Sequence, residues 1–101
     1  MRIKLKAGAR LRGLKPEMMF ALMVIREVYE ELGSEELVIT AGTDGVHRDG
    51  SLHNTGEGLD IRTRDFNPAD RIEAHRLIQH RLRDQYDCVL EATHLHVEHD
   101  P

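Results

Sequence analysis

The feature that most constrains the fold is a strict alternation near the end of the chain, His94-Leu95-His96-Val97-Glu98. Side chains of a β-strand point alternately to opposite faces, so the two histidines and the glutamate share one face, and the leucine and valine share the other. One face therefore packs on a core while the other is available for chemistry. Two neighbouring imidazoles would repel each other if both were charged, which favours a metal-binding or proton-transfer role.

The size and residue usage of the chain exclude several classes of protein. A length of 101 residues predicts one domain, 1–101. The single cysteine, Cys88, excludes an internal disulfide and a multi-cysteine zinc site. Seven histidines, against two tyrosines, two phenylalanines and no tryptophan, indicate metal or acid–base chemistry rather than an aromatic platform for nucleic acid.

Two further patterns bear on location and partners. The longest apolar run, 18–25, is far shorter than the roughly 20 residues that span a bilayer, and the chain does not open with the pattern of a signal peptide. We therefore expect a monomer that is cytoplasmic as synthesised and contacts neither membrane nor nucleic acid. Residues 1–15 carry six basic side chains and no acidic one, which we interpret as a short strand with a solvated face rather than a polyanion site.

Helical periodicity is present in two segments. Pro16 suits a first helical turn, and Gly33 suits the end of that helix. The three methionines Met18, Met19 and Met23 are interpreted as core packing, because they lie on or beside its apolar stripe. Asn67 with Pro68 resembles the start of a second helix. The expected core positions of the two helices are Met18, Ala21, Leu22, Ile25, Val28, Tyr29 and Leu32, then Ala74, Leu77, Ile78 and Leu82.

The remaining segments predict strands and one long loop. A β-branched run at 37–40 is followed by a region rich in turn formers, 42–50. Segments 88–91 and 94–98 suggest two adjacent strands, which could form a hairpin. His75 and His80 are expected on the surface of the second helix. The order of elements predicts an α+β fold in which helices pack on a small, mostly antiparallel sheet.

A second chemical pattern lies in the middle of the chain, Ser51-Leu52-His53-Asn54-Thr55-Gly56-Glu57-Gly58-Leu59-Asp60-Ile61. Its glycines permit positive φ, so the segment can fold back and bring His53 and Asp60 to one point. An imidazole, a carboxylate and a second imidazole from the terminal strand would suit Zn²⁺ with one position left for water, which is typical of a catalytic site.

These motifs together resemble the zinc-binding pattern of the D-alanyl-D-alanine metallopeptidases. This clan contains D-Ala-D-Ala carboxypeptidases, murein endopeptidases and phage endolysins, and it shares a hedgehog/DD-peptidase fold with the hedgehog signalling domain. The likeness extends over nearly the whole chain. It rests on S-L-H-N-T-G-E-G-L-D-I and H-L-H-V-E, with I-T-A-G resembling the T-S-G of the family.

The resemblance implies a role for each matching residue. His53, Asp60 and His96 would be the ligands of one Zn²⁺, and His94 would stabilise the transition state. Were His94 the ligand instead, Glu91 would stand three residues before it, where peptidases of the clan often place the catalytic acid. We choose Glu91 as the general base in either case.

The chain departs from the family at three positions. Thr93 stands where the acid would precede His96, Thr43 and Asp44 stand where many members have a substrate-binding arginine, and Gly58 replaces an alanine. Arg48, from the same loop as Thr43, could substitute as the substrate-binding residue.

The resemblance implies a zinc peptidase that hydrolyses D-amino-acid-containing bonds of cell-wall peptidoglycan, as a carboxypeptidase or an endopeptidase. A phage-encoded protein would reach the wall on lysis or in the virion. Two alternatives come from other classes. A non-catalytic, hedgehog-like module would keep the zinc ligands but tolerate a poorly placed base. A nucleotide hydrolase of the histidine-triad type would use alternate histidines on a strand end, but Glu98 stands where the third should be.

Overall fold

The fold is built on one mixed five-stranded sheet in the order β1-β2-β3-β5-β4. The structure, a computed structural model, describes residues 1–44 and 55–101. The strands are β1 (Arg2–Leu5), β2 (Glu36–Ala41), β3 (Gly58–Arg62), β4 (Tyr86–Leu90) and β5 (His94–His99). β1 pairs with β2 in parallel, while the β2–β3, β3–β5 and β5–β4 pairs are antiparallel.

The α+β class is therefore confirmed, but the sheet is mixed rather than mostly antiparallel as expected. The parallel pair has a clear origin in the chain. Helix α1 (Pro16–Glu31) lies between β1 and β2 and returns the chain to the start of the next strand, so both strands run the same way.

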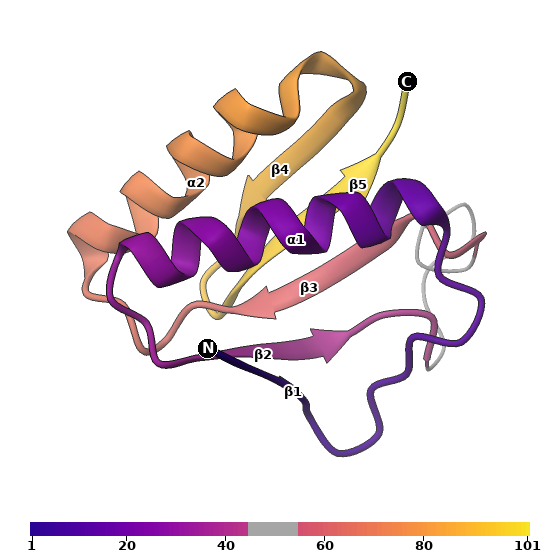
Figure 1. Ribbon diagram of the computed structural model, residues 1–101, viewed down its shortest axis with the longest axis horizontal. Helices are drawn as coiled ribbons and strands as arrows, with labels where there is room; N and C mark the ends of the chain where they lie inside the picture. The colour runs from indigo at the N-terminus through magenta and orange to yellow at the C-terminus, as the bar shows by residue number, and fades with distance from the viewer. Residues whose placement is uncertain (45–54) are drawn as a thin grey trace.

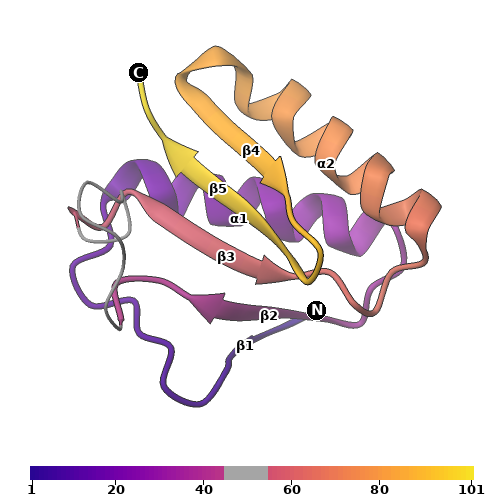
Figure 2. The same ribbon diagram turned by 180° about the vertical axis from the view of Figure 1, so that it is seen from behind.

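Both helices cover the same face of the sheet (Figure 1). α1 crosses the middle strands, and α2 (Pro68–Leu82), which ends in the short 3-10 turn Arg83–Gln85, lies against β4. Seen from behind, β2, β3, β5 and β4 lie in front of the helices, and no described helix covers that side (Figure 2). The sheet thus has a packed face and an open face.

The alternation of the strands explains these two faces. Leu59 and Ile61 of β3 and Leu95 and Val97 of β5 are fully buried against the helices, whereas the residues between them are only half-buried. The helices contribute the rest of the core, with buried Met18, Ala21, Leu22, Ile25, Val28 and Tyr29 from α1 and Ala74, Ile78 and Leu82 from α2.

The interpretation of the methionines is correct for only one of the three. Met18 is fully buried, but Met19 is 46% exposed and Met23 is 68% exposed. Met19 and Met23 lie on the side of α1 that faces away from the sheet, and no described element packs there. An apolar residue beside the buried stripe of a helix is covered only if the fold supplies a second neighbour.

The start of α2 depends on a side-chain cap, as expected. The Oδ1 atom of Asn67 accepts a hydrogen bond from the backbone N–H of Asp70 at 2.8 Å, and Pro68 occupies the first turn. We expect Asn67→Ala to lower the free energy of unfolding by about 1 kcal/mol, because it leaves that donor unpaired. Urea unfolding of both proteins measures the difference. Asn67→Asp, which can still accept the bond, is the control and should retain most of the stability.

Within the described residues, no helix is both long enough and apolar enough to cross a membrane.

Candidate active site

The open face of the sheet holds a carboxylate–histidine cluster, which we define as Asp60, His94, His96 and Glu98. Strand pairing explains its assembly. Asp60 of β3 lies directly opposite His96 of β5 in the antiparallel register, and His94 and Glu98 are the next residues of β5 on the same face. All four side chains are partly buried, with exposed fractions between 16% and 29%.

His96 lies between two carboxylates. Its Nδ1 atom is 2.8 Å from Oδ1 of Asp60, and its Nε2 atom is 2.7 Å from Oε1 of Glu98. Ionised carboxylates only accept hydrogen bonds, so this arrangement favours the form of the ring that donates from both nitrogens. The hydrogen bond with Asp60 is the main cause that raises the pKa of His96, and Glu98 adds to it, while burial acts in the opposite direction.

This raised pKa predicts how the metal-free protein responds to pH. A histidine whose pKa is higher in the folded state stabilises the fold fully below its unfolded pKa of about 6.5, and this contribution is lost as the pH rises through the folded value. We therefore expect the chelator-treated protein to lose stability from about pH 6.5 upward. Urea unfolding at several pH values measures this loss. His96→Gln is the control, and an equally steep loss in that variant would contradict the assignment to His96.

His94 approaches the same carboxylate from the neighbouring position. Its Nε2 atom is 3.7 Å from Oδ2 of Asp60, and its Nδ1 atom is 3.1 Å from the hydroxyl oxygen of Thr93. One carboxylate therefore faces two imidazoles, one through each oxygen.

The distances in this cluster fit a zinc ion held by Asp60 and one histidine. With Zn–N and Zn–O bonds of roughly 2.0–2.2 Å and tetrahedral angles, two ligand atoms lie about 3.3 Å apart. The Asp60–His96 and Asp60–His94 separations of 2.8 and 3.7 Å lie on either side of this value. Of the two histidines, His96 would be the better ligand, because Glu98 can accept the proton of its other nitrogen and so orient the ring, as carboxylates commonly do for zinc-bound histidines.

Asp60, His94 and His96 do not form a set of three metal ligands among the described residues, because their ligand atoms do not all lie within 4.8 Å of one another. The third predicted ligand, His53, and the predicted substrate-binding residue, Arg48, lie outside the described residues. The zinc triad thus remains a prediction, of which the structure brings together Asp60 and His96.

Glu91, the predicted general base, lies in the turn between β4 and β5. Its backbone N–H donates to the carbonyl of His94 at 2.8 Å, and its side chain is exposed. No hydrogen bond joins the Glu91 carboxylate to another described residue. By contrast, Glu98 contacts His96 directly, although sequence reasoning gave it no role beyond its place in the strand. The two-residue period that puts Glu98 on the face of His96 was the available signal.

A cleft beside the cluster carries positive charge. It has a volume of about 480 Å³, and Asp60 and His94 form part of its wall. Three basic side chains, Lys6, Arg62 and Arg64, line it as well. Arg62 lies directly opposite His94 in the strand pairing, which explains why a cation stands next to the histidine. Basic side chains next to Asp60 and His94 suit a ligand that carries a carboxylate.

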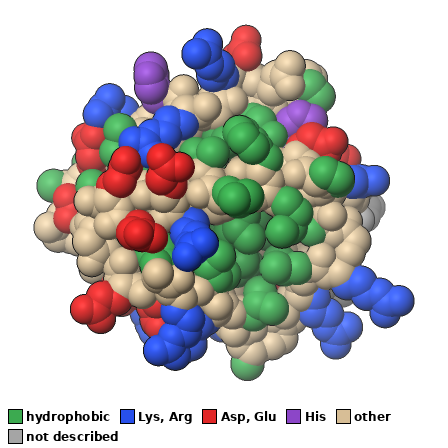
Figure 3. All heavy atoms as spheres, in the orientation of Figure 1, with side chains coloured by type: hydrophobic (Ala, Val, Ile, Leu, Met, Phe, Trp, Pro, Cys, Tyr) green, Lys and Arg blue, Asp and Glu red, His purple; other side chains and the backbone are tan. Residues whose placement is uncertain are grey.

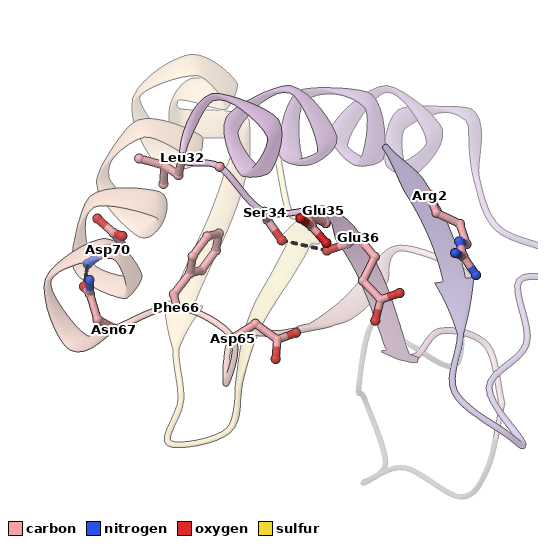
Figure 4. A pocket seen from close by; sticks show the side chains of 10 residues that line it. Arg2, Leu32, Ser34, Glu35, Glu36, Asp65, Phe66, Asn67 and Asp70 are labelled. Atoms are coloured by element: carbon pink, nitrogen blue, oxygen red, sulfur yellow. Dashed lines mark hydrogen bonds between the residues drawn. The ribbon is translucent and has the colours of Figure 1, made fainter.

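Two other features of the described residues resemble sites but lack matching chemistry. Asp87, Glu98 and Asp100 bring carboxylate oxygens within 4.8 Å of one another, yet such acidic groups are common without a metal. A cavity of about 720 Å³ between β1, β2 and the start of α2 is lined by four acidic side chains together with Arg2 and Phe66 (Figure 4). Its polar contacts are structural, since Ser34 donates to the carbonyl of Glu36 and Asn67 caps α2.

The other titratable residues of α2 and β4 do not join the site. His80 is exposed as expected, but His75 is half-buried, with Nε2 2.7 Å from the carbonyl oxygen of Cys88. Burial raises the pKa of the Cys88 thiol to about 12, with a smaller effect from Asp87, so the thiol stays protonated at neutral pH.

Comparison of the sequence with models of protein families and with curated proteins finds no match.

Proposed function

We propose that this protein is a zinc-dependent peptidase that hydrolyses D-amino-acid-containing peptides of bacterial peptidoglycan. The observation that carries the proposal is the Asp60–His96 pair, with Glu98 on the second nitrogen of the histidine, on the open face of the sheet. The class of substrate follows from the resemblance of the two motifs to the D-alanyl-D-alanine metallopeptidases. A hedgehog/DD-peptidase-like fold belongs to the same proposal.

In this proposal each site residue would have a distinct role in peptide hydrolysis. Asp60, His96 and His53 would hold Zn²⁺, which would lower the pKa of a water molecule from about 15.7 toward about 7. Glu91 would accept a proton from this water and return it to the leaving amine. Near Asp60, His94 would donate a hydrogen bond to the oxygen of the substrate carbonyl as negative charge develops there.

The basic cleft supports a peptide substrate with a free carboxylate. Lys6, Arg62 and Arg64 line the cleft next to Asp60 and His94, so a terminal carboxylate bound there would place the adjacent peptide bond close to the cluster. Arg48, the substrate-binding residue predicted from the sequence, would add a further contact to the substrate. This arrangement favours carboxypeptidase over endopeptidase activity.

Matched synthetic peptides test the proposed substrate. The zinc-loaded protein is incubated with a wall peptide ending in D-Ala-D-Ala, with its L-Ala-L-Ala counterpart, and with the D-Ala-D-Ala peptide amidated at its end. We expect mass spectrometry to detect release of D-alanine from the first peptide only. Equal cleavage of the free and amidated peptides would contradict the carboxylate role of the cleft, and cleavage of the L-peptide alone would contradict the substrate class.

One observation favours a second candidate, a zinc-binding module without catalysis. The side chain of Glu91 is exposed and forms no hydrogen bond with another described residue, so the base is not held in place by its surroundings. A module would bind zinc through the same residues and bind wall peptides without cleaving them.

A further inference from the structure

We propose that the segment before α1, residues 10–15, holds Asp60 in the position that zinc binding requires, and that Asp44 fastens this segment. We call residues 10–15 the strap. Asp44 is then a positioning residue, because it acts on the zinc ligand through the backbone and does not itself contact the ligands His96 and Asp60 in the described hydrogen bonds. The inference rests on the zinc site of the proposed function, but not on which peptide bond is cleaved.

Asp60 lies at the place where the pairing of β2 with β3 ends. It stands opposite Ala41, and the register shifts between Ile39 and Ala41, so an irregularity of the bulge type lies directly beside it. Such bulges change the direction of side chains near active sites. Within the described residues, the first two residues of β3 pair with β5 and not with β2. The side of Asp60 that faces β2 therefore needs another support.

The strap contacts the chain directly after β2. The backbone N–H groups of Gly42 and Arg10 both donate to Oδ1 of Asp44, at 2.7 and 2.9 Å. The backbone N–H of Thr43 donates to the carbonyl of Arg10 at 2.9 Å, and its hydroxyl donates to the carbonyl of Arg12 at 2.6 Å. One carboxylate oxygen thus joins the strap to the end of β2, and Thr43 adds two bonds beside it.

Two glycines allow the strap to come this close. A Cβ atom at Gly42 would lie 2.3 Å from the carbonyl oxygen of Arg10, and the φ of Gly42 is not positive, so this position requires space rather than a special backbone conformation. At the other end of the strap, Lys15 donates its N–H to the carbonyl of Gly56 at 2.9 Å. A Cβ atom at Gly56 would lie 2.2 Å from the carbonyl oxygen of Gly13. The strap therefore contacts both the end of β2 and the residue just before β3.

The basic side chains of the strap do not fix it to the sheet. Arg10, Arg12 and Lys15 are exposed. Basic side chains project at the lower right of Figure 3, on the side where Figure 1 places this segment. Leu11 and Leu14 are partly buried against the core. Backbone hydrogen bonds therefore set where the strap lies between and beside these two leucines.

This arrangement gives a role to a departure from the family pattern. Thr43 and Asp44 stand where many D-alanyl-D-alanine metallopeptidases have a substrate-binding arginine, and in this chain both residues bind the strap. A metal ligand must be held to within about 0.5 Å of its productive position by the residues around it. Loss of such a support commonly weakens metal binding by about 10- to 100-fold.

Zinc affinity, measured by competition with a chromophoric chelator, tests the role of Asp44. We expect Asp44→Ala to weaken zinc binding by about tenfold, because the end of β2 is then free to move relative to the strap. Asp44→Asn still offers an acceptor oxygen and should stay within about twofold of the wild type. Circular dichroism shows whether each variant is folded at the temperature of the measurement. If Asp44→Ala does not fold, Thr43→Val, which removes only a hydroxyl, should weaken zinc binding in the same direction.

Asn67→Ala is the control for a general loss of stability. It removes the cap of α2, at the opposite end of the sheet from the strap, and should keep the zinc affinity of the wild type (Figure 1). Wild-type affinity in a folded Asp44→Ala variant, or equal weakening in Asn67→Ala, would overturn the proposal. A wild type that binds no zinc would overturn both this proposal and the peptidase. A wild type that binds zinc but cleaves no wall peptide would contradict the peptidase alone, and the zinc affinities would still decide the role of the strap.

Discussion

Alanine substitution of His96 should abolish stoichiometric zinc binding and remove the whole stabilisation that zinc confers. In the wild type, a metal that binds only the folded state stabilises it by about 2.7 kcal/mol when free zinc is 100 times its dissociation constant. For a chain of this size, that corresponds to a rise in melting temperature of about 10–20 °C. The variant should melt at one temperature with and without zinc.

Elemental analysis and melting curves with and without chelator measure these two effects. Asp60→Ala should behave as His96→Ala does, since the two side chains face each other at 2.8 Å. His80→Ala is the matched control, because this histidine is exposed on α2, and it should keep full zinc content. A His96→Ala variant with full zinc, together with an empty His94→Ala variant, would show that His94 is the ligand.

Substitution of two glutamates should separate catalysis from metal orientation. Glu91→Gln should keep its zinc and lower the turnover of wall peptides by about 10²- to 10⁴-fold, which is typical of losing a general acid–base group. Glu98→Gln should weaken zinc binding by about 10- to 100-fold, because it changes the residue that orients the ring of His96. At saturating zinc this variant should recover most of its turnover.

Peptide hydrolysis and zinc affinity, both measured for each variant, distinguish the two roles. Asp84→Asn is the control, since it removes an exposed carboxylate from the 3-10 turn Arg83–Gln85. If Glu91→Gln retains full turnover while Glu98→Gln loses it even at saturating zinc, the general base is Glu98 and the choice of Glu91 is wrong. If the wild type binds zinc and wall peptide but cleaves nothing, the module is the better description.

Local signals in the sequence were enough to predict most elements of the fold. Pro16 and Gly33 bracket α1, Asn67 caps α2, and the terminal segments form the predicted hairpin of β4 and β5. Each of these depends on residues close together in the chain. The parallel pairing of β1 with β2 depends on where α1 returns the chain, so no local pattern shows it.

The packed neighbours of a helix or strand were also not predictable. Met19 and Met23 lie beside a correctly identified stripe, but whether they are covered depends on a partner that no local pattern reveals. His75 was expected on the surface, yet the position of β4 brings the carbonyl of Cys88 to its ring. A helical period specifies directions around the helix and not what lies in those directions.

The candidate site was predictable to the extent that it follows from strand geometry. The period of β5 puts His94, His96 and Glu98 on one face, as the structure confirms. That Asp60 stands opposite His96 needed the register of β3 against β5, which the sequence motif implied only through its resemblance to a family. The hydrogen bond from His96 to Glu98 and the cationic cleft depend on side-chain placement and required the structure.

Titration of the metal-free protein with zinc, with the rate of D-alanine release from a D-Ala-D-Ala wall peptide as the readout, tests whether this protein is a zinc peptidase. We expect no cleavage without metal, a rate that rises in proportion to added zinc, and a plateau at about one equivalent per chain. Cleavage that is equally fast in the presence of a chelator, or one equivalent of bound zinc with no release of D-alanine, would contradict it.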